Sequence, residues 1–248
     1  MICSGFLKRI YMLNKSKVMR NMLIGMIGAA ICMLACWLAM AYGKGNIRNG
    51  YIQSNWPKMP YLRFEASLIL SGIGISLYYV GLKEMIKVVK TMRSRRRPVS
   101  ISMARLFEIG AITSIISYMF IQAGYIMMAL VYKMLFNTSL MGTDIISTVE
   151  GMFYYIAIPL LSFLVLSVAG VSIPCIYFMY CDRFKVLKVC MLFNPLILWG
   201  LGEMLKLTKN YHLIDFASAA IPFGYLLMMA AGLSHVAKMP SKKKGEKV

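Results

Sequence analysis

Long apolar stretches, separated by short polar segments, follow one another along the whole chain. Six of them approach or exceed the length of about 20 mostly apolar residues that a helix needs to cross a bilayer. Their approximate bounds are 22–42, 64–82, 106–131, 152–180, 186–205 and 216–237. Within each stretch, apolar residues occupy all faces of the predicted helix and do not form a single stripe. This pattern is typical of helices in lipid. The pattern therefore predicts an all-α membrane protein built as a bundle of six transmembrane helices.

The composition supports a membrane domain. Hydrophobic residues make up 59% of the 248 residues and charged residues only 15%, whereas a soluble domain has about half apolar and about a quarter charged residues. We expect a single membrane domain over residues 22–237. Two basic tails, residues 1–21 and 238–248, flank this domain, and both are too short to fold alone.

The distribution of positive charge predicts the orientation of the bundle. The chain carries 28 lysines and arginines against 9 acidic residues. Of these basic residues, 21 fall in the two tails and in the segments after the second and fourth predicted spans, and 7 fall in the alternate segments. Because cytoplasmic segments are enriched in Lys and Arg, we expect both termini in the cytoplasm. The cell membrane is the expected location.

A cleaved signal peptide is an alternative reading of the N-terminal region. A basic start, an apolar run and the small-residue step Ala39-Met40-Ala41 have the order found in signal peptides. Cleavage at this step would leave five spans and an external N-terminus. The apolar run is longer than a usual signal core, so the six-span arrangement is favoured.

Sequence motifs for catalysis, metal binding and nucleotide binding are absent. No G-x-S-x-G, P-loop or dinucleotide fingerprint occurs, and His212 and His235, the two histidines, are too few for a multi-histidine metal site. We therefore expect no cofactor and favour a non-enzymatic function. Because the basic residues lie between apolar runs and not on a soluble domain, we also expect no nucleic-acid partner.

Acidic residues gather on the predicted external side and suggest a ligand site. Glu65, Glu150 and Glu203 are expected at similar depths near the outer ends of spans two, four and five, with Asp144 and His212 nearby. If these helices adjoin, they form an acidic cup for a cation, a cationic solute or a lipid amine. Each of the three glutamates also has a structural explanation. Glu65 complements a helix dipole, Ser147-x-x-Glu150 has the form of a capping box, and Glu203 has Lys206 three residues on.

Asn194-Pro195 interrupts the fifth predicted span near its middle. A proline inside a helix frees a carbonyl and bends the helix, and in lipid that carbonyl needs a partner. An interhelical hydrogen bond is one interpretation, and a ligand contact is the other. The candidate ligand-site residues are therefore Glu65, Asp144, Glu150, Asn194, Glu203 and His212.

The segment after the second predicted span is strongly basic. We expect it to contact the lipid bilayer through anionic headgroups, which attract Lys and Arg near the membrane surface. The residues are Lys83, Lys87, Lys90, Arg93, Arg95, Arg96 and Arg97. A simple orientation signal is the alternative.

Three features between the fourth and fifth spans carry a resemblance to a known group of proteins. They are an acidic start of span four (Asp144, Ser147, Glu150), a basic turn (Arg183, Lys185) and Phe193-Asn194-Pro195. Here the chain resembles an uncharacterised group of small six-helix membrane proteins from Gram-positive bacteria. The resemblance implies a six-span fold in a bacterial membrane and brings no activity.

Three functional classes remain open. The first is binding or transport of a small solute or lipid through an outward-facing polar site, with a cavity that reaches Asn194 and Glu203. The second is an accessory subunit for a membrane protein partner, with an exposed small-residue face at Gly28, Cys32 and Cys36. The third is a membrane-embedded enzyme that modifies lipids, with paired ionisable groups in a cleft open to lipid. We favour the first class.

Overall fold

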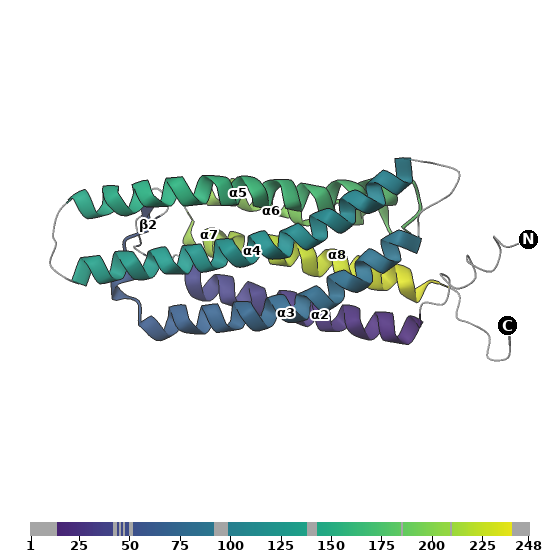
Figure 1. Cartoon of the computed structure of the whole chain (residues 1–248), viewed down its shortest axis with the longest axis horizontal. Coiled ribbons are helices and arrows are strands. Elements are labelled where there is room, and N and C mark those ends of the chain that lie inside the picture. The colour runs from purple at the N-terminus through teal and green to yellow at the C-terminus, as the bar shows by residue number, and fades with distance from the viewer. Residues whose placement is uncertain are drawn as a thin grey trace, which may run out of the picture.

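The computed structural model describes residues 14–41, 44, 46, 48–49, 52–91, 99–137, 143–184, 186–208 and 210–239. These residues form an elongated bundle of helices (Figure 1). The helices are α2 (Lys15–Met40), α3 (Tyr61–Thr91), α4 (Val99–Asn137), α5 (Thr143–Tyr180), α6 (Pro195–Lys206), α7 (Tyr211–Ala217) and α8 (Ala220–Ala237). Two short strands, β1 (Arg48–Asn49) and β2 (Ile52–Gln53), pair antiparallel and precede the 3-10 turn η1 (Trp56–Lys58), and a second 3-10 turn, η2 (Lys188–Leu192), precedes α6.

Five helices of the described chain are long and apolar enough to cross a membrane. Their candidate spans are Lys15–Met40, Tyr61–Lys90, Ile101–Asn137, Ser147–Tyr180 and Ala220–Ala237. A bilayer core of about 30 Å is crossed by about 20 helical residues, so the longer helices extend beyond it. The chain is therefore a multi-pass helical membrane protein, as the apolar pattern predicts.

The predicted fifth span, 186–205, is not one continuous helix. The chain forms η2 first, and α6 begins at Pro195 and has 12 residues. Asn194 is the N-cap, and its side-chain oxygen accepts hydrogen bonds from Leu196 N and Ile197 N, both at 3.1 Å. Proline suits the first turn of a helix because its missing N–H is not needed there. The expected kink at Pro195 is therefore wrong, and Asn194-Pro195 starts a short helix instead.

The start of α5 also differs from the expected one. The helix begins at Thr143, so Ser147 and Glu150 lie within it and not at its cap. A capping box needs its first residue at the N-cap position. The capping-box interpretation of Ser147 and Glu150 is therefore wrong.

Small residues allow the closest helix contacts in the bundle. A Cβ atom at Gly28 of α2 would clash with the backbone of Tyr78 in α3, and one at Gly110 of α4 would lie 2.5 Å from the carbonyl carbon of Gly170 in α5. Small residues have this role in lipid because close backbone approach increases packing contacts. Two tightly packed pairs result, α2 with α3 and α4 with α5.

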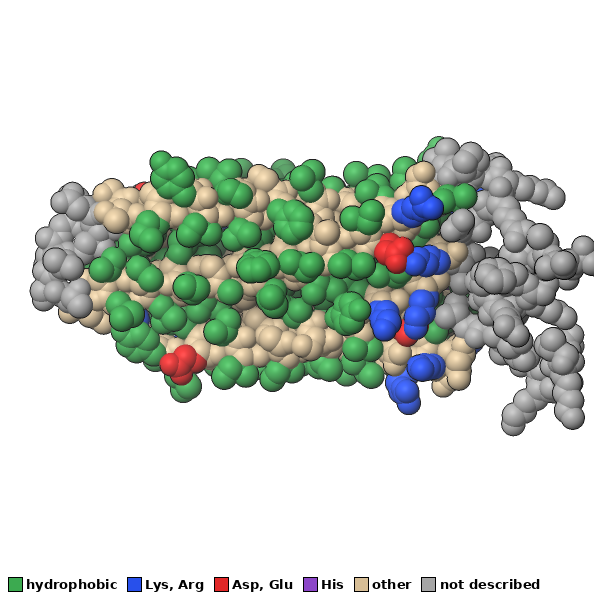
Figure 2. All heavy atoms as spheres, viewed as in Figure 1, with side chains coloured by type: hydrophobic (Ala, Val, Ile, Leu, Met, Phe, Trp, Pro, Cys, Tyr) green, Lys and Arg blue, Asp and Glu red, His purple; other side chains and the backbone are tan. Residues whose placement is uncertain are grey.

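The two ends of the bundle differ in chemistry. Lys15 Nζ donates a hydrogen bond to the carbonyl oxygen of Ala237 at 2.7 Å, so the start of α2 and the end of α8 meet. We call this the terminal end, and we call the opposite end, where β1 and β2 lie, the hairpin end. Figure 2 shows hydrophobic side chains along the length of the bundle and a group of Lys and Arg side chains toward the terminal end.

Candidate functional site

A cavity of about 440 Å³ lies between α4 and α5 on one side and α2, α6, α7 and α8 on the other. Most of its wall is apolar, with Ile121 and Met128 from α4, Phe153 and Leu160 from α5, and Ile221 from α8. Ligand pockets typically have about 300–1,000 Å³ and mostly apolar walls with a few polar groups. The cavity has the size and the lining of a site for a lipid-like molecule.

The short α6 explains why a cavity forms here. Twelve residues extend about 18 Å, much less than the neighbouring α5. The start of α6 is pinned inside the bundle, because a Cβ atom at Gly224 of α8 would clash with Pro195 and Leu196 N donates to Ser172 Oγ of α5 at 3.2 Å. From this point α6 packs along α8, where Gly202 lies against Ala220. The space between α5 and the α6–α8 pair is therefore left without a helix to fill it.

A charged pair on α6 lines the cavity. Lys206 Nζ lies 2.6 Å from Glu203 Oε1, and Trp199 Nε1 donates to the same oxygen at 3.0 Å. Residues 199, 203 and 206 share one helix face because they are separated by one and two turns. The Glu203 side chain is 51% exposed and that of Lys206 is 24% exposed. The pair therefore forms a polar rim where the cavity meets its surroundings.

Between α2 and α3, β2 and η1 pack against α4 at the hairpin end of the cavity. Gln53 of β2 lines the cavity, and its side-chain nitrogen donates to Tyr125 Oη at 3.0 Å. Trp56 of η1 is fully buried and packs edge-on against Tyr125, with ring centroids 5.3 Å apart. Lys133 of α4 is also buried and donates to the carbonyl oxygen of Pro57 at 2.7 Å. These contacts tie the connection to α4.

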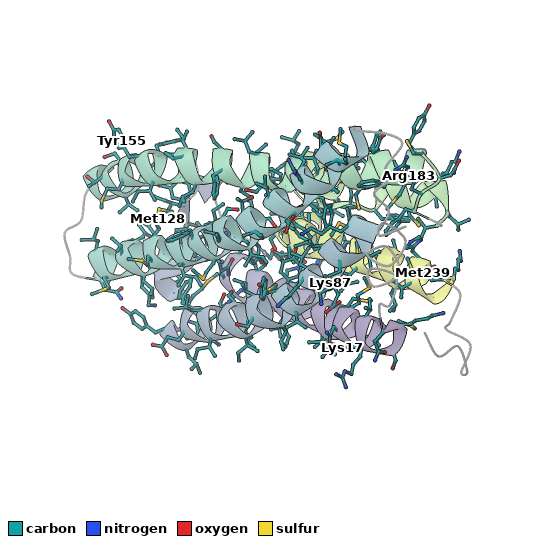
Figure 3. The ribbon with its side chains drawn as sticks, turned by 45° about the vertical axis from the view of Figure 1, so that its right-hand side comes forward. Lys17, Lys87, Met128, Tyr155, Arg183 and Met239 are labelled. Carbon is teal, nitrogen blue, oxygen red and sulfur yellow. The ribbon has the colours of Figure 1, made fainter. Side chains whose placement is uncertain are left out.

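The cavity opens toward the side of the bundle. Three of its lining residues, Met127 of α4 and Met152 and Ile156 of α5, are 65%, 56% and 53% exposed. These side chains belong both to the cavity wall and to the outer surface of the bundle. Figure 3 labels Met128 in the hairpin-end half of α4, and Tyr155 on α5 with its side chain directed away from the bundle.

Polar side chains line the inner part of the cavity, near the middle of the bundle. Cys36 Sγ lies 2.8 Å from Tyr118 Oη, and Gln122 Nε2 donates to Ser67 Oγ of α3 at 3.2 Å. Gln122 is 2% exposed. A hydrogen bond from Gln122 to another span is predicted by its polar side chain within an apolar run, whereas no sequence signal predicts the contact between Cys36 and Tyr118.

Of the six predicted ligand-site residues, Glu203 lines the cavity. Asn194 is 1% exposed, caps α6, and lies outside the cavity lining. Glu65 is exposed on α3 and also lies outside the lining. Glu150 follows the lining residue Val149 but does not itself line the cavity.

Of the other two predicted residues, one lies outside the cavity lining and the other has a side chain that the structure does not describe. His212 is exposed at the start of α7, where its ring lies 3.9 Å from the ring of Tyr211. The side chain of Asp144 lies outside the described residues. The proposed acidic cup is therefore not assembled around this cavity from the residues that the structure describes, and Glu203 is its one member here.

Three of the predicted anionic-lipid contacts lie in the last part of α3. Lys83, Lys87 and Lys90 are exposed on α3. Lys87 pairs with Glu84 at 2.7 Å and Lys90 pairs with Glu108 of α4 at 2.6 Å, so two of the three lysines are already partly neutralised. Arg93, Arg95, Arg96 and Arg97 lie outside the described residues.

The five long apolar helices of the described chain define a multi-pass helical membrane protein. Over residues 12–239 the chain matches DUF6796, a family of unknown function, and it belongs to that family. No curated protein and no solved structure matches the chain. The resemblance to an uncharacterised membrane family agrees with this assignment.

Proposed function

We propose that the protein binds a membrane-soluble amphipathic molecule, a lipid or a lipid-like solute, in the cavity between α5 and α6. The observation that carries this proposal is a cavity of about 440 Å³ with apolar walls that also contribute to the outer surface of the bundle. Apolar walls favour a hydrocarbon chain because burial of apolar surface is the dominant attractive term in such sites. The lateral opening provides the path from the bilayer.

The orientation proposed for the bundle follows the positive-inside rule. Five long helices and the shorter path through η2 and α6 bring the chain across the bundle six times, with both termini in the cytoplasm. The basic residues gathered near the terminal end support this arrangement (Figure 2). The cavity then lies toward the external leaflet of a bacterial cytoplasmic membrane, in a Gram-positive organism if the resemblance extends to the source.

The accessory-subunit alternative has less support. It predicts an exposed small-residue face at Gly28, Cys32 and Cys36. Cys32 and Cys36 are each 2% exposed, and Gly28 packs against the backbone of α3. This face therefore packs within the protein.

The experiment that tests the proposal combines native mass spectrometry with a pair of matched glycine variants. Gly124 lines the cavity, and a Cβ atom there would meet only Leu160 Cδ1, at 4.0 Å. Gly124→Phe fills the cavity with an aromatic ring, whereas Gly72→Phe, on the exposed face of α3 where a Cβ atom meets nothing within 4 Å, serves as the control.

We expect the wild-type protein and Gly72→Phe to retain a bound lipid after gentle purification, and Gly124→Phe to lose it. Equal lipid retention by all three proteins, or an empty wild-type protein after addition of membrane lipids, would show that the cavity does not bind lipid.

A further inference from the structure

A small chamber adjoins the cavity near the middle of the bundle. It has a volume of about 10 Å³, which is room for about one water-sized group. Tyr118, Leu164, Ile221 and Pro222 line both spaces, so the chamber lies directly beside the cavity.

Two buried hydroxyl groups, neither of them in a well-formed hydrogen bond, belong to residues that line this chamber. Tyr78 of α3 is 5% exposed and Tyr225 of α8 is 4% exposed. Their rings pack edge-on with centroids 5.0 Å apart. The two hydroxyls interact with each other and with that of Ser114, but within the described part of the chain neither makes a hydrogen bond of normal distance and angle. Ser114 lines the same chamber, but its hydroxyl donates to the carbonyl oxygen of Ala111 at 2.9 Å.

An unpartnered buried hydroxyl is costly, and polar groups in a protein interior are nearly always hydrogen-bonded. Polar groups within membrane spans are also expensive and frequently functional. Two phenols that converge on one space are therefore suited to an oxygen atom that accepts hydrogen bonds from their O–H groups. A single hydroxyl or carbonyl oxygen fits the volume of the chamber, whereas a phosphate group does not.

The charge of the chamber also limits the ligand. Its described lining consists of Ala, Cys, Tyr, Ser, Leu, Ile and Pro, without a charged residue. A charged headgroup would lose its hydration there without an opposite charge to replace it. The charged pair that lines the cavity, Glu203 with Lys206, lies on α6 and is not part of the chamber lining.

We infer that the ligand is a neutral lipid whose polar end is a single hydroxyl or carbonyl oxygen, bound between Tyr78 and Tyr225 with its hydrocarbon chain in the larger cavity. This inference rests on the proposed lipid-binding function and adds the chemical class of the headgroup and its direction. The head lies at mid-depth in the bundle, and the chain runs toward the lateral opening.

The test measures binding of a radiolabelled long-chain isoprenoid alcohol to the full-length protein in lipid nanodiscs. The hydrocarbon that lacks the hydroxyl and the phosphate ester of the same alcohol are the competitors. The double variant Tyr78→Phe/Tyr225→Phe removes both hydroxyls and keeps both rings. Tyr79→Phe/Tyr155→Phe removes two hydroxyls from side chains that are 46% and 87% exposed and is the matched control.

We expect the alcohol to bind about tenfold or more tightly than the hydrocarbon, since each neutral hydrogen bond changes affinity by roughly twofold to tenfold. Tyr78→Phe/Tyr225→Phe should remove this difference by lowering the affinity for the alcohol and not that for the hydrocarbon. The control variant should change neither affinity. The phosphate ester should compete less well than the alcohol.

Equal affinities for alcohol and hydrocarbon in the wild-type protein, or an alcohol affinity that Tyr78→Phe/Tyr225→Phe leaves unchanged, would overturn the assignment of the headgroup. Stronger competition by the phosphate ester would also overturn it. Gly124→Phe distinguishes failure of the headgroup assignment from failure of the proposed lipid binding. If Gly124→Phe abolishes binding of both alcohol and hydrocarbon while the tyrosine variants have no effect, the cavity binds lipid and only the headgroup assignment is wrong.

The same double variant has an expected effect in the absence of ligand. Removing a buried hydroxyl that has no partner is neutral or stabilising, whereas removing a bonded one is destabilising. The melting temperature of the empty Tyr78→Phe/Tyr225→Phe protein should therefore equal or exceed that of the wild type, and a lower melting temperature would show that the hydroxyls are bonded within the protein.

Discussion

Trp199 Nε1 donates a hydrogen bond to Glu203 Oε1 at 3.0 Å, one turn along α6, and both residues line the cavity. The indole therefore holds the carboxylate, which also pairs with Lys206, at the edge of an apolar space. An indole has an apolar body and a polar tip, which is why Trp is common where an apolar region meets a polar one. The relationship marks the boundary between the hydrocarbon part of the cavity and its polar rim.

Glu203→Ala should change the environment of Trp199 with little effect on stability. The carboxylate is half exposed, and exposed ion pairs contribute about 0–1 kcal/mol. We expect the free energy of unfolding to fall by no more than about 1 kcal/mol, while the fluorescence of Trp199 shifts because its acceptor is gone. Glu65→Ala, at an exposed position of α3, should alter neither quantity. A loss of several kcal/mol would show that the pair is structural.

Gly28→Ala should destabilise the bundle strongly. The added Cβ atom would clash with the backbone of Tyr78, so α2 and α3 would have to move apart. Adding atoms to a well-packed interior typically lowers the free energy of unfolding by about 1–3 kcal/mol. Gly72→Ala in α3 is the control, because a Cβ atom there meets nothing within 4 Å. Thermal unfolding in detergent distinguishes the two. Equal melting temperatures would mean that α2 and α3 are less closely packed than described.

The hydrogen bond between Gln122 and Ser67 should contribute a coupling energy of about 0.6 kcal/mol, the average for such bonds between membrane helices. A double-mutant cycle with Gln122→Leu and Ser67→Ala measures it. Ser67 Oγ also donates to the carbonyl oxygen of Ala35 at 2.7 Å, so Ser67→Ala alone should cost more than the coupling energy. Additive effects of the two substitutions would show that the side chains do not interact.

Cysteine accessibility tests the proposed orientation. Single cysteines at Lys17, near the terminal end, and at Ser54, at the hairpin end, are placed in a protein whose native cysteines are replaced by serine. Both positions are exposed. In intact cells, a membrane-impermeant thiol reagent should label Ser54→Cys and not Lys17→Cys. The reverse pattern would invert the orientation, and labelling of both would contradict termini in the cytoplasm.

The acidic cup shows where prediction from the sequence failed at the site. Glu65, Glu150 and Glu203 are each near the end of an apolar run, but their proximity depends on which helices adjoin and how each is rotated. The structure places Glu203 on the cavity and Glu65 on an exposed face of α3. Depth along the membrane is encoded by distance from the end of a run, whereas rotation is set by the packing of glycines such as Gly28 and Gly110.

Tyr78 and Tyr225 illustrate the opposite failure. A tyrosine inside an apolar run is unremarkable, and these two residues are separated by most of the chain. They meet because α3 and α8 both pack against α2, and only that contact turns two ordinary side chains into one polar chamber.

The sequence by itself determined that the chain is a multi-pass helical protein, because a run of apolar residues in lipid must satisfy its backbone hydrogen bonds within a helix. It also located Asn194-Pro195 as an interruption. Only the tertiary structure decided that this interruption begins a short helix, since Gly224 and Ser172 hold its start inside the bundle. The cavity follows from that placement, because a helix that starts late and packs on α8 leaves the space beside α5 unfilled.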